Sequence, residues 1–123
     1  MKYVVLIYGN AASRELWEQF SETERGEGLA YYARLTEELT ASGELVVTHA
    51  LADAATAKRV SVSEGTALTT DGPFAEAKEH LAGFYLLEVP GEERALEIAA
   101  RIPEAALGLV EVRAVRSLDP AEW

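Results

Sequence analysis

The chain has 123 residues, and its 21 acidic and 11 basic side chains give a formal net charge of −10 at pH 7. This acidic surplus disfavours contact with a phosphate backbone, which needs clustered lysine and arginine, so we expect no direct binding of nucleic acid. Cysteine is absent, which excludes disulfides, thiol nucleophiles and zinc–thiolate sites.

Length and composition fit a single domain over residues 1–123. Hydrophobic residues make up 49% of the chain and charged residues 26%, which is typical of a soluble globular protein. No apolar run approaches the roughly 18 residues of a membrane span, and no cleavage-site pattern follows Met1. We therefore expect a cytoplasmic protein that does not insert into membranes.

Before its midpoint the chain predicts two strands separated by helical segments. The patterns favour a strand over residues 3–8, a helix over 14–20, a helix over 29–41 and a strand over 44–51. Ser13 is the expected N-cap of the first helix, and Ser21 with Glu24 three residues later predicts a capping box for the next. Gly26 and Gly28 interrupt the helical pattern, so we expect a break or a bend there.

The second strand holds one of the two histidines. Strand alternation places His49 in phase with Leu45, Val47 and Leu51, so its side chain should point into an otherwise apolar environment. A lone histidine in such a setting is more often a hydrogen-bonded interior side chain than a ligand.

The second half of the chain predicts a strand pair, a loop and a second strand–helix–strand unit. The expected elements are strands over residues 57–63, 67–70, 80–89 and 109–115, a turn at 64–65 and a helix over 92–102. Two β-α-β units predict an α+β fold with an antiparallel sheet and both helices on one face. Residues 3–8 and 81–89 are apolar in both phases, so we expect a second copy to cover the open sheet face in a homodimer.

The loop that follows the strand pair carries the most informative stretch of the sequence. It reads Asp71-Gly72-Pro73-Phe74, followed by Glu76, Lys78 and Glu79 and by an apolar run over 81–86. With the opening run 2–8 and the closing run 110–113, this ordered set resembles the DGPF branch of the YCII-related family. The resemblance implies a ferredoxin-like α+β fold of the dimeric α/β-barrel type. It also implies an unassigned reaction and an association with extracytoplasmic-function sigma factor systems.

Asp71 is the first candidate for a functional side chain. Its carboxylate would accept a proton or orient a ligand at the mouth of a cleft, and the structural alternative is a turn cap, which is common for aspartate before glycine. Lys78 is expected to pair with Asp71 and fix the loop. Arg59 offers a planar fork for an anion, with an ion pair to an acidic neighbour as the favoured alternative. Phe74 fits a core or pocket-wall position.

Glu76 and His80 form a second candidate group. If Pro73 starts a helical turn, these two side chains lie one turn apart on one face and offer acid–base chemistry; the alternative is a solvated run of charges. Other YCII-related proteins are described with a histidine–aspartate pair as their catalytic feature. Neither His49 nor His80 is matched to that histidine, because neither lies in the first strand or at the start of the first helix.

Together these residues predict a small-ligand cleft lined by the 71–74 loop, with proton-transfer chemistry of isomerase or lyase type. The candidate catalytic groups are Asp71, His49 and His80, and the candidate ligand-binding residues are Arg59, Asp71, Phe74, Glu76 and Lys78. No metal-ligand spacing, phosphate-binding glycine loop or nucleophile elbow occurs, so we expect no metal and no cofactor. The alternatives are a noncatalytic binding or regulatory module of sigma factor systems, and a structural dimer whose loop charges only hold the fold.

Overall fold

The computed structural model describes the whole chain, residues 1–123. Its strands are β1 Lys2–Gly9, β2 Leu45–Ala50, β3 Lys58–Ser63, β4 Thr66–Asp71, β5 His80–Glu88 and β6 Val110–Ala114. Its helices are α1 Ala11–Gln19, α2 Glu22–Ala41 and α3 Glu92–Ala99, with short 3-10 turns η1 Ala54–Thr56, η2 Pro103–Leu107 and η3 Pro120–Glu122. None of the helices is both long and apolar enough to cross a membrane.

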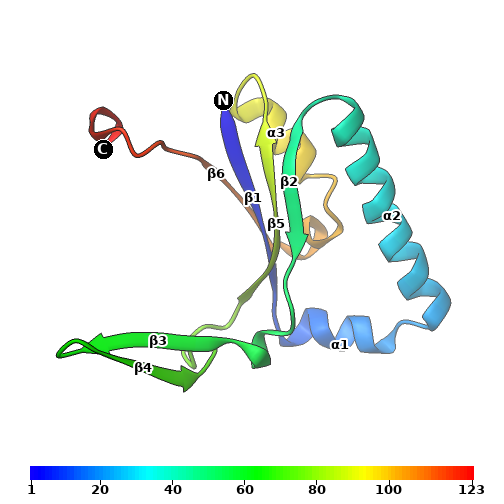
Figure 1. Cartoon of the computed structure of the whole chain (residues 1–123). Helices are drawn as coiled ribbons and strands as arrows, with labels where there is room; N and C mark the ends of the chain where they lie inside the picture. The colour runs from blue at the N-terminus through cyan, green and yellow to red at the C-terminus, as the bar shows by residue number, and fades with distance from the viewer.

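Four strands form one sheet in the order β2-β5-β1-β6, and every neighbouring pair is antiparallel. This is the order of a ferredoxin-like β-α-β-β-α-β sheet once the inserted β3–β4 pair is set aside. The helices α2 and α3 lie on the same face of the sheet, and α1 runs across one end of it (Figure 1). The predicted α+β class with an antiparallel sheet is therefore confirmed.

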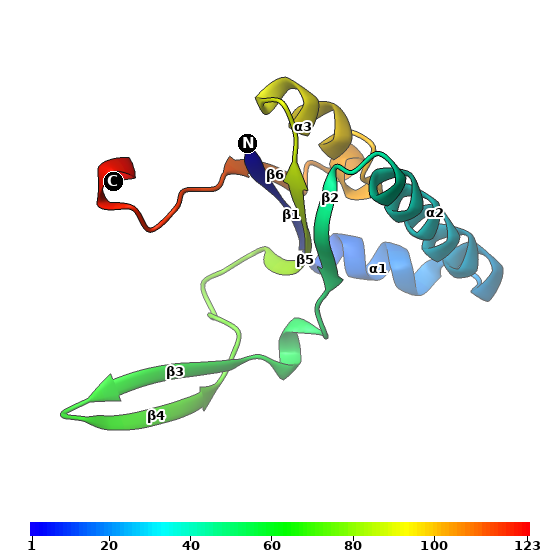
Figure 2. The ribbon, with the colours of Figure 1, turned by 45° about the horizontal axis from the view of Figure 1, so that its top comes forward.

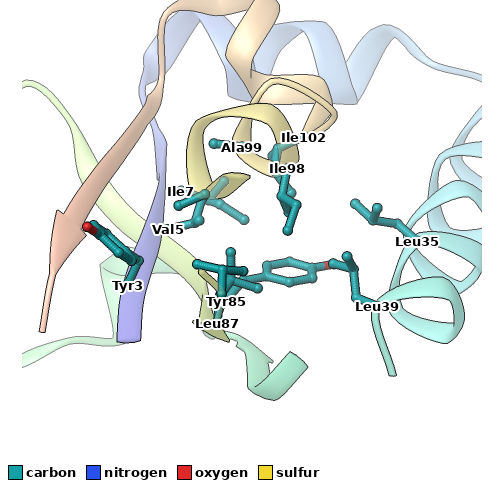
Figure 3. Close-up of a cluster of buried hydrophobic side chains, with 12 residues drawn as sticks. Tyr3, Val5, Ile7, Leu35, Leu39, Tyr85, Leu87, Ile98, Ala99 and Ile102 are labelled. Carbon is teal, nitrogen blue, oxygen red and sulfur yellow. The ribbon is translucent and has the colours of Figure 1, made fainter. Parts of the chain in front are cut away.

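The core lies between the helical layer and alternate residues of the two central strands. Its strand residues are Tyr3, Val5 and Ile7 of β1 and Tyr85 and Leu87 of β5. Its helix residues include Leu35 and Leu39 of α2 and Ile98 of α3, and Ile102 joins them from the segment after α3 (Figure 3). Each fully buried aliphatic side chain of this size contributes about 1.5–3 kcal/mol, so this cluster holds the helices on the sheet.

The helix starts follow capping chemistry, with one shift from the sequence prediction. Asn10, not Ser13, is the N-cap of α1: its side chain accepts from the Ser13 amide at 2.8 Å, and the Ser13 hydroxyl accepts from the Asn10 amide at 2.9 Å. Ser13 therefore acts at the third helical position, where it completes a reciprocal capping box. The capping box predicted from Ser21 and Glu24 is confirmed at the start of α2.

The helix α2 is one unbroken element of 20 residues. The break predicted near Gly26 and Gly28 is wrong, and the chain turns instead at Phe20, whose backbone is extended. A glycine inside a helix costs about 1 kcal/mol relative to alanine, which the burial of Leu35 and Leu39 outweighs. The two glycines weaken the helix without ending it.

A register shift in β2 decides which of its side chains face the core. The pairing with β5 slips between Leu45 and Val47, so that Leu45 packs against the core while Val47 and His49 lie on the opposite face. The predicted common phase of these residues is therefore wrong, because one irregular position reverses the alternation. His49 is exposed, and its ring centre lies 5.9 Å from that of Phe84.

The sheet face opposite α2 and α3 has no helix on it (Figure 1). It is largely apolar on the strands β1, β2 and β5, while Glu111 and Arg113 of β6 lie on it opposite Leu6 and Val4. Its apolar residues, from the three strands β2, β5 and β1, are Val4, Leu6, Val47, Phe84 and Leu86. We call this surface the open sheet face.

The strands β3 and β4 form a two-stranded arm that projects from the end of the sheet, away from α2 (Figures 1 and 2). The turn predicted at its tip is confirmed, since Glu64 and Gly65 both have positive φ, 49° and 79°, as a type I′ hairpin turn requires. Every residue of the arm is exposed, including Val60 and Val62. An isolated two-stranded hairpin is only marginally stable in water, so the arm lacks the packing that stabilises the main sheet.

Candidate functional site

A cleft of about 1100 Å³ opens at the end of the sheet, where α1, α2, η2 and the root of the arm meet. Of its 27 lining residues 16 are hydrophobic, so its wall is mostly apolar. Ligand sites are commonly concave and apolar with a few polar groups that fix orientation. A smaller hollow of about 440 Å³ adjoins the cleft and shares eight lining residues with it: Leu51, Ala52, Asp53, Ala54, Pro73, Ala77, His80 and Leu81.

Much of the apolar wall comes from α1. Leu16, Trp17 and Phe20 have the spacing that predicts a buried helical stripe, but α1 contains no buried residue. All three line the cleft instead, and the rings of Trp17 and Phe20 meet edge to face with centres 6.1 Å apart. Helical periodicity marks an apolar face without saying whether a core or a cleft lies against it.

Asp53 and Arg14 form an ion pair in the wall of the cleft, with Oδ1 and Nη2 2.8 Å apart. Asp53 is also the N-cap of η1, where it accepts from the Ala55 amide at 2.9 Å. The hydrogen bond from the Ala55 amide, and after it the positive charge of Arg14, hold the pKa of the Asp53 carboxyl below its usual range. Asp53 therefore stays ionised and ties the root of the arm to α1.

Tyr32 and Glu104 form a second polar pair on the wall, between α2 and η2. The Tyr32 hydroxyl donates to Oε1 of Glu104. Burial, and then this hydrogen bond to a carboxylate, raise the pKa of Tyr32 well above its usual value. The hydroxyl therefore stays protonated. The sequence predicts neither pair, and its only local signal is the aspartate that precedes η1.

Asp71, the first candidate from the sequence, lies at the end of β4 with its side chain 87% exposed. Its carboxylate pairs with Lys58, so the predicted pair with Lys78 is wrong. The cause is the hairpin register, which sets Lys58 directly opposite Asp71 on the arm. Asp71 lines neither the cleft nor the smaller hollow.

Arg59 and Phe74 stack on each other close to that pair. The guanidinium carbon lies 4.3 Å from the ring centre, a cation–π contact, so Arg59 forms this contact in place of the ion pair favoured from the sequence. The ring is 60% exposed and borders the smaller hollow, which makes Phe74 a wall residue. Gly72 packs closely here, because an added Cβ would lie 3.1 Å from Cγ of Arg59 and 3.3 Å from the Ala57 carbonyl oxygen.

The loop after Asp71 does border the cleft, through residues other than the aspartate. Pro73 and Lys78 line it, and so does His80 at the start of β5. Among the predicted catalytic side chains only His80 is placed there, and among the predicted ligand-binding side chains only Lys78 is. His49 lies on the open sheet face, away from the cleft.

The expected alignment of Glu76 with His80 on one helical turn is wrong. The segment is a nonhelical loop with one turn bond, from the Ala77 amide to the Phe74 carbonyl at 3.2 Å. A proline can occupy the first turn of a helix, but a helix also needs consecutive backbone hydrogen bonds after it. Such a series does not follow Pro73, and the chain enters β5 at His80. Glu76 is exposed and lines neither hollow.

The charged and imidazole groups of the cleft thus comprise two internal pairs, one lysine and one histidine. No group of three histidine, cysteine, aspartate or glutamate side chains comes together to hold a metal ion. Such a set of groups suits the binding of a small organic molecule and the movement of a proton on it.

The fold and the cleft define a small α+β protein with a ligand-sized apolar site. A model of the YCII-related domain matches residues 1–119, and the chain belongs to the YCII-related family, as its motifs predict. It is 31% identical over 124 residues to uncharacterized protein R00369 of Rhizobium meliloti (strain 1021), covering 99% of this chain and 98% of that one.

A solved structure with the same fold is 5-chloro-2-hydroxyhydroquinone dehydrochlorinase (TftG) from Burkholderia phenoliruptrix AC1100, in complex with 2,5-dihydroxybenzoquinone. The TM-score is 0.52, the sequence identity is 13%, and the match covers 94% of each chain. At this identity the likeness shows the fold alone.

Proposed function

We propose that this protein binds a small cyclic organic molecule in the cleft and transfers a proton on it, with His80 as the acid–base group. The observation that carries the proposal is that the cleft wall is mostly apolar and holds a single histidine. Imidazole gives and takes protons near neutral pH. In poorly solvated surroundings the contacts between charged groups and a ligand are also stronger than in water.

The fold-level analogy agrees with this chemistry. The solved neighbour is named a dehydrochlorinase and holds a quinone, and loss of hydrogen chloride includes removal of a proton. A shared fold does not carry function by itself, so the proposal rests on the cleft. We infer isomerase- or lyase-like chemistry on a ring with an exchangeable hydrogen.

The test uses 2,5-dihydroxybenzoquinone as the first probe, because its ring hydrogens exchange with solvent deuterium through a tautomer. The wild-type protein should accelerate this exchange, followed by proton NMR in D2O. His80→Gln should reduce the acceleration by roughly 100-fold, the low end of general acid–base contributions. His49→Gln, which changes the histidine on the open sheet face, should leave it unchanged.

Equal acceleration by His80→Gln and the wild type would contradict the role of His80. Binding of the probe without any exchange would favour the alternative, a noncatalytic module of extracytoplasmic-function sigma factor systems. Membership of the DGPF branch is likewise a proposal, supported by the Asp71-Gly72-Pro73-Phe74 motif.

We also propose a homodimer of the dimeric α/β-barrel type, in which two open sheet faces pack on each other. In support, Leu6, Phe84 and Leu86 lie on the open sheet face and are only partly buried within the chain, and the arm and the C-terminal segment both project away from α2 (Figures 1 and 2). The interface should exceed roughly 1,000 Å².

Leu86→Arg should give a monomer by light scattering at micromolar concentration, whereas Leu96→Arg, on the exposed side of α3, should not. A wild-type monomer would contradict the proposal.

A further inference from the structure

The titratable side chains on the cleft wall divide into those with a partner and those without. Tyr8 donates to Glu111 at 2.7 Å, Arg14 donates to Asp53 at 2.8 Å, and Tyr32 donates to Glu104. These groups are satisfied within the chain, and their positions are fixed by their partners. They form the scaffold of the site.

Lys78 and His80 are the exceptions. Both line the cleft, and neither joins any ion pair of the chain. Lys78 stays unpaired although acidic side chains outnumber basic ones by 21 to 11 and Glu76 and Glu79 flank it in the sequence. The groups left for a ligand are therefore one ammonium and one imidazole, which together match an anion.

Building on the proposed function, we propose that the ligand is an organic anion, a phenolate or an enolate, and that Lys78 holds its charged oxygen. When His80 removes a proton from a carbon beside a carbonyl group, the C–H bonding pair forms a carbon–carbon double bond and the π pair of the carbonyl moves to its oxygen. The products are an imidazolium and an enolate, whose oxygen is stabilised by the Lys78 ammonium. Return of the proton to carbon reverses the step or completes an isomerisation.

A local cation is what this chain needs to hold an anion. The net charge of −10 repels anions, but salt screens this repulsion over about 10 Å. An ammonium group in direct contact with the anion, beside a mostly apolar wall, attracts it more strongly than the distant net charge repels it. The reason is that Coulomb energy grows as distance and dielectric constant fall. The other cation on the wall, Arg14, is already paired with Asp53, which leaves Lys78.

The test compares 4-nitrophenolate with 4-nitroanisole, which has nearly the same size and shape but no charge. At a pH where the phenol is ionised, the wild type should bind the phenolate roughly tenfold more tightly than the ether, as a charge-assisted hydrogen bond predicts. Calorimetric titration measures both affinities. Lys78→Met should erase the preference, and Lys78→Arg should keep most of it. The matched control is Lys58→Met, which removes a lysine outside the cleft that pairs with Asp71 and should behave as the wild type.

Equal affinity of the wild type for both compounds, or an unchanged preference in Lys78→Met, would overturn this inference and leave the deuterium-exchange test of His80 standing. Failure of both compounds to bind would also overturn it, and failure of 2,5-dihydroxybenzoquinone as well would overturn the proposed function. Because Lys78 is exposed in a loop, Lys78→Met should fold normally. A melting curve beside the wild type checks this.

Discussion

The carboxylate of Asp53 and the guanidinium of Arg14 meet at 2.8 Å although they lie 39 residues apart in the sequence. The contact joins the first turns of α1 to the segment from which the arm leaves the sheet. The same Asp53 oxygen also caps η1 through the Ala55 amide, so one atom helps to fix both the direction of the arm and the position of α1. Both residues lie in the cleft wall, and the shape of the cleft therefore depends on the root of the arm.

Two glycines give opposite predictions for stability. Gly26 lies inside α2 with nothing within 4 Å of an added Cβ, so Gly26→Ala should stabilise the protein by about 0.5–1 kcal/mol. At Gly83 in β5 an added Cβ would lie 2.9 Å from the carbonyl oxygen of His49 in β2, so Gly83→Ala should destabilise it by about 1–3 kcal/mol. Denaturant unfolding of both variants measures the effects, and a stabilised Gly83→Ala would contradict the close approach of β2 to β5.

The pair of Glu44 and Arg94 should make stability depend on acidic pH. Arg94 Nε and Nη2 lie 2.7 and 3.0 Å from the two carboxylate oxygens, and these bonds, followed by one from Ser42, lower the pKa of Glu44 from 4.5 to about 2. A carboxyl whose pKa falls on folding contributes stability above its unfolded pKa and loses it as pH falls through its folded pKa. Glu44→Gln should therefore be less stable than the wild type at neutral pH.

That difference in stability should shrink between about pH 4.5 and about pH 2. Melting curves across this range measure it. Glu97→Gln removes only an exposed contact to the same arginine, 3.1 Å long, and should change stability much less. A Glu44→Gln deficit that is equally large at pH 2 would show that lost packing, and not the charge, causes it.

Tyr32→Phe should lower stability and weaken its dependence on alkaline pH. Folding raises the pKa of Tyr32 above its ordinary value of 10.0, so its contribution is complete below pH 10 and is lost as pH rises further, because the unfolded phenol ionises first. At neutral pH the lost hydrogen bond to the Glu104 carboxylate should cost about 1.5–3 kcal/mol. Denaturant unfolding at neutral pH and above pH 10 measures both effects. Tyr31→Phe, whose exposed hydroxyl donates to the Arg101 carbonyl at 2.7 Å, is the control and should lower stability less at neutral pH.

Features that depend on residues close together in the sequence are predictable. The capping box of Ser21 and Glu24, the turn at Glu64-Gly65 and the apolar strands follow from local backbone chemistry. The order of these elements then favours an antiparallel sheet with helices on one face, because two β-α-β units interleave in that way. The fold class is therefore available from the sequence.

Features that depend on distant residues are not predictable in this way. Asp53 and Tyr32 meet partners 39 and 72 residues away, and no local pattern marks such contacts. The outward turn of His49 arises from a slip in pairing between β2 and β5, which alternation within one strand does not show. Asp71 stands out in the sequence because charge and turn residues coincide there, but the hairpin register pairs it with Lys58 and keeps it off the cleft wall.

Asp53 and Asp71 offer a matched test of which aspartate serves the site. Asp71→Asn removes an 87% exposed partner of Lys58, so it should change stability by less than about 1 kcal/mol and leave binding of 2,5-dihydroxybenzoquinone unchanged. Asp53→Asn keeps a side chain able to cap η1 but weakens the contact to Arg14 that fixes the root of the arm to α1, and the less ordered cleft wall should weaken binding. Asp53→Ala loses the cap as well, so it should also lower the melting temperature.

The loss of affinity for the probe should therefore be largest for Asp53→Ala, smaller for Asp53→Asn and absent for Asp71→Asn. Calorimetric titration beside melting curves measures it. Arg14→Ala combined with Asp53→Ala should weaken binding by less than the sum of the single changes, because both residues act through one contact. If Asp71→Asn instead weakened binding more than Asp53→Ala, the ligand would lie against the arm, and the cleft bounded by α1 would not be the site.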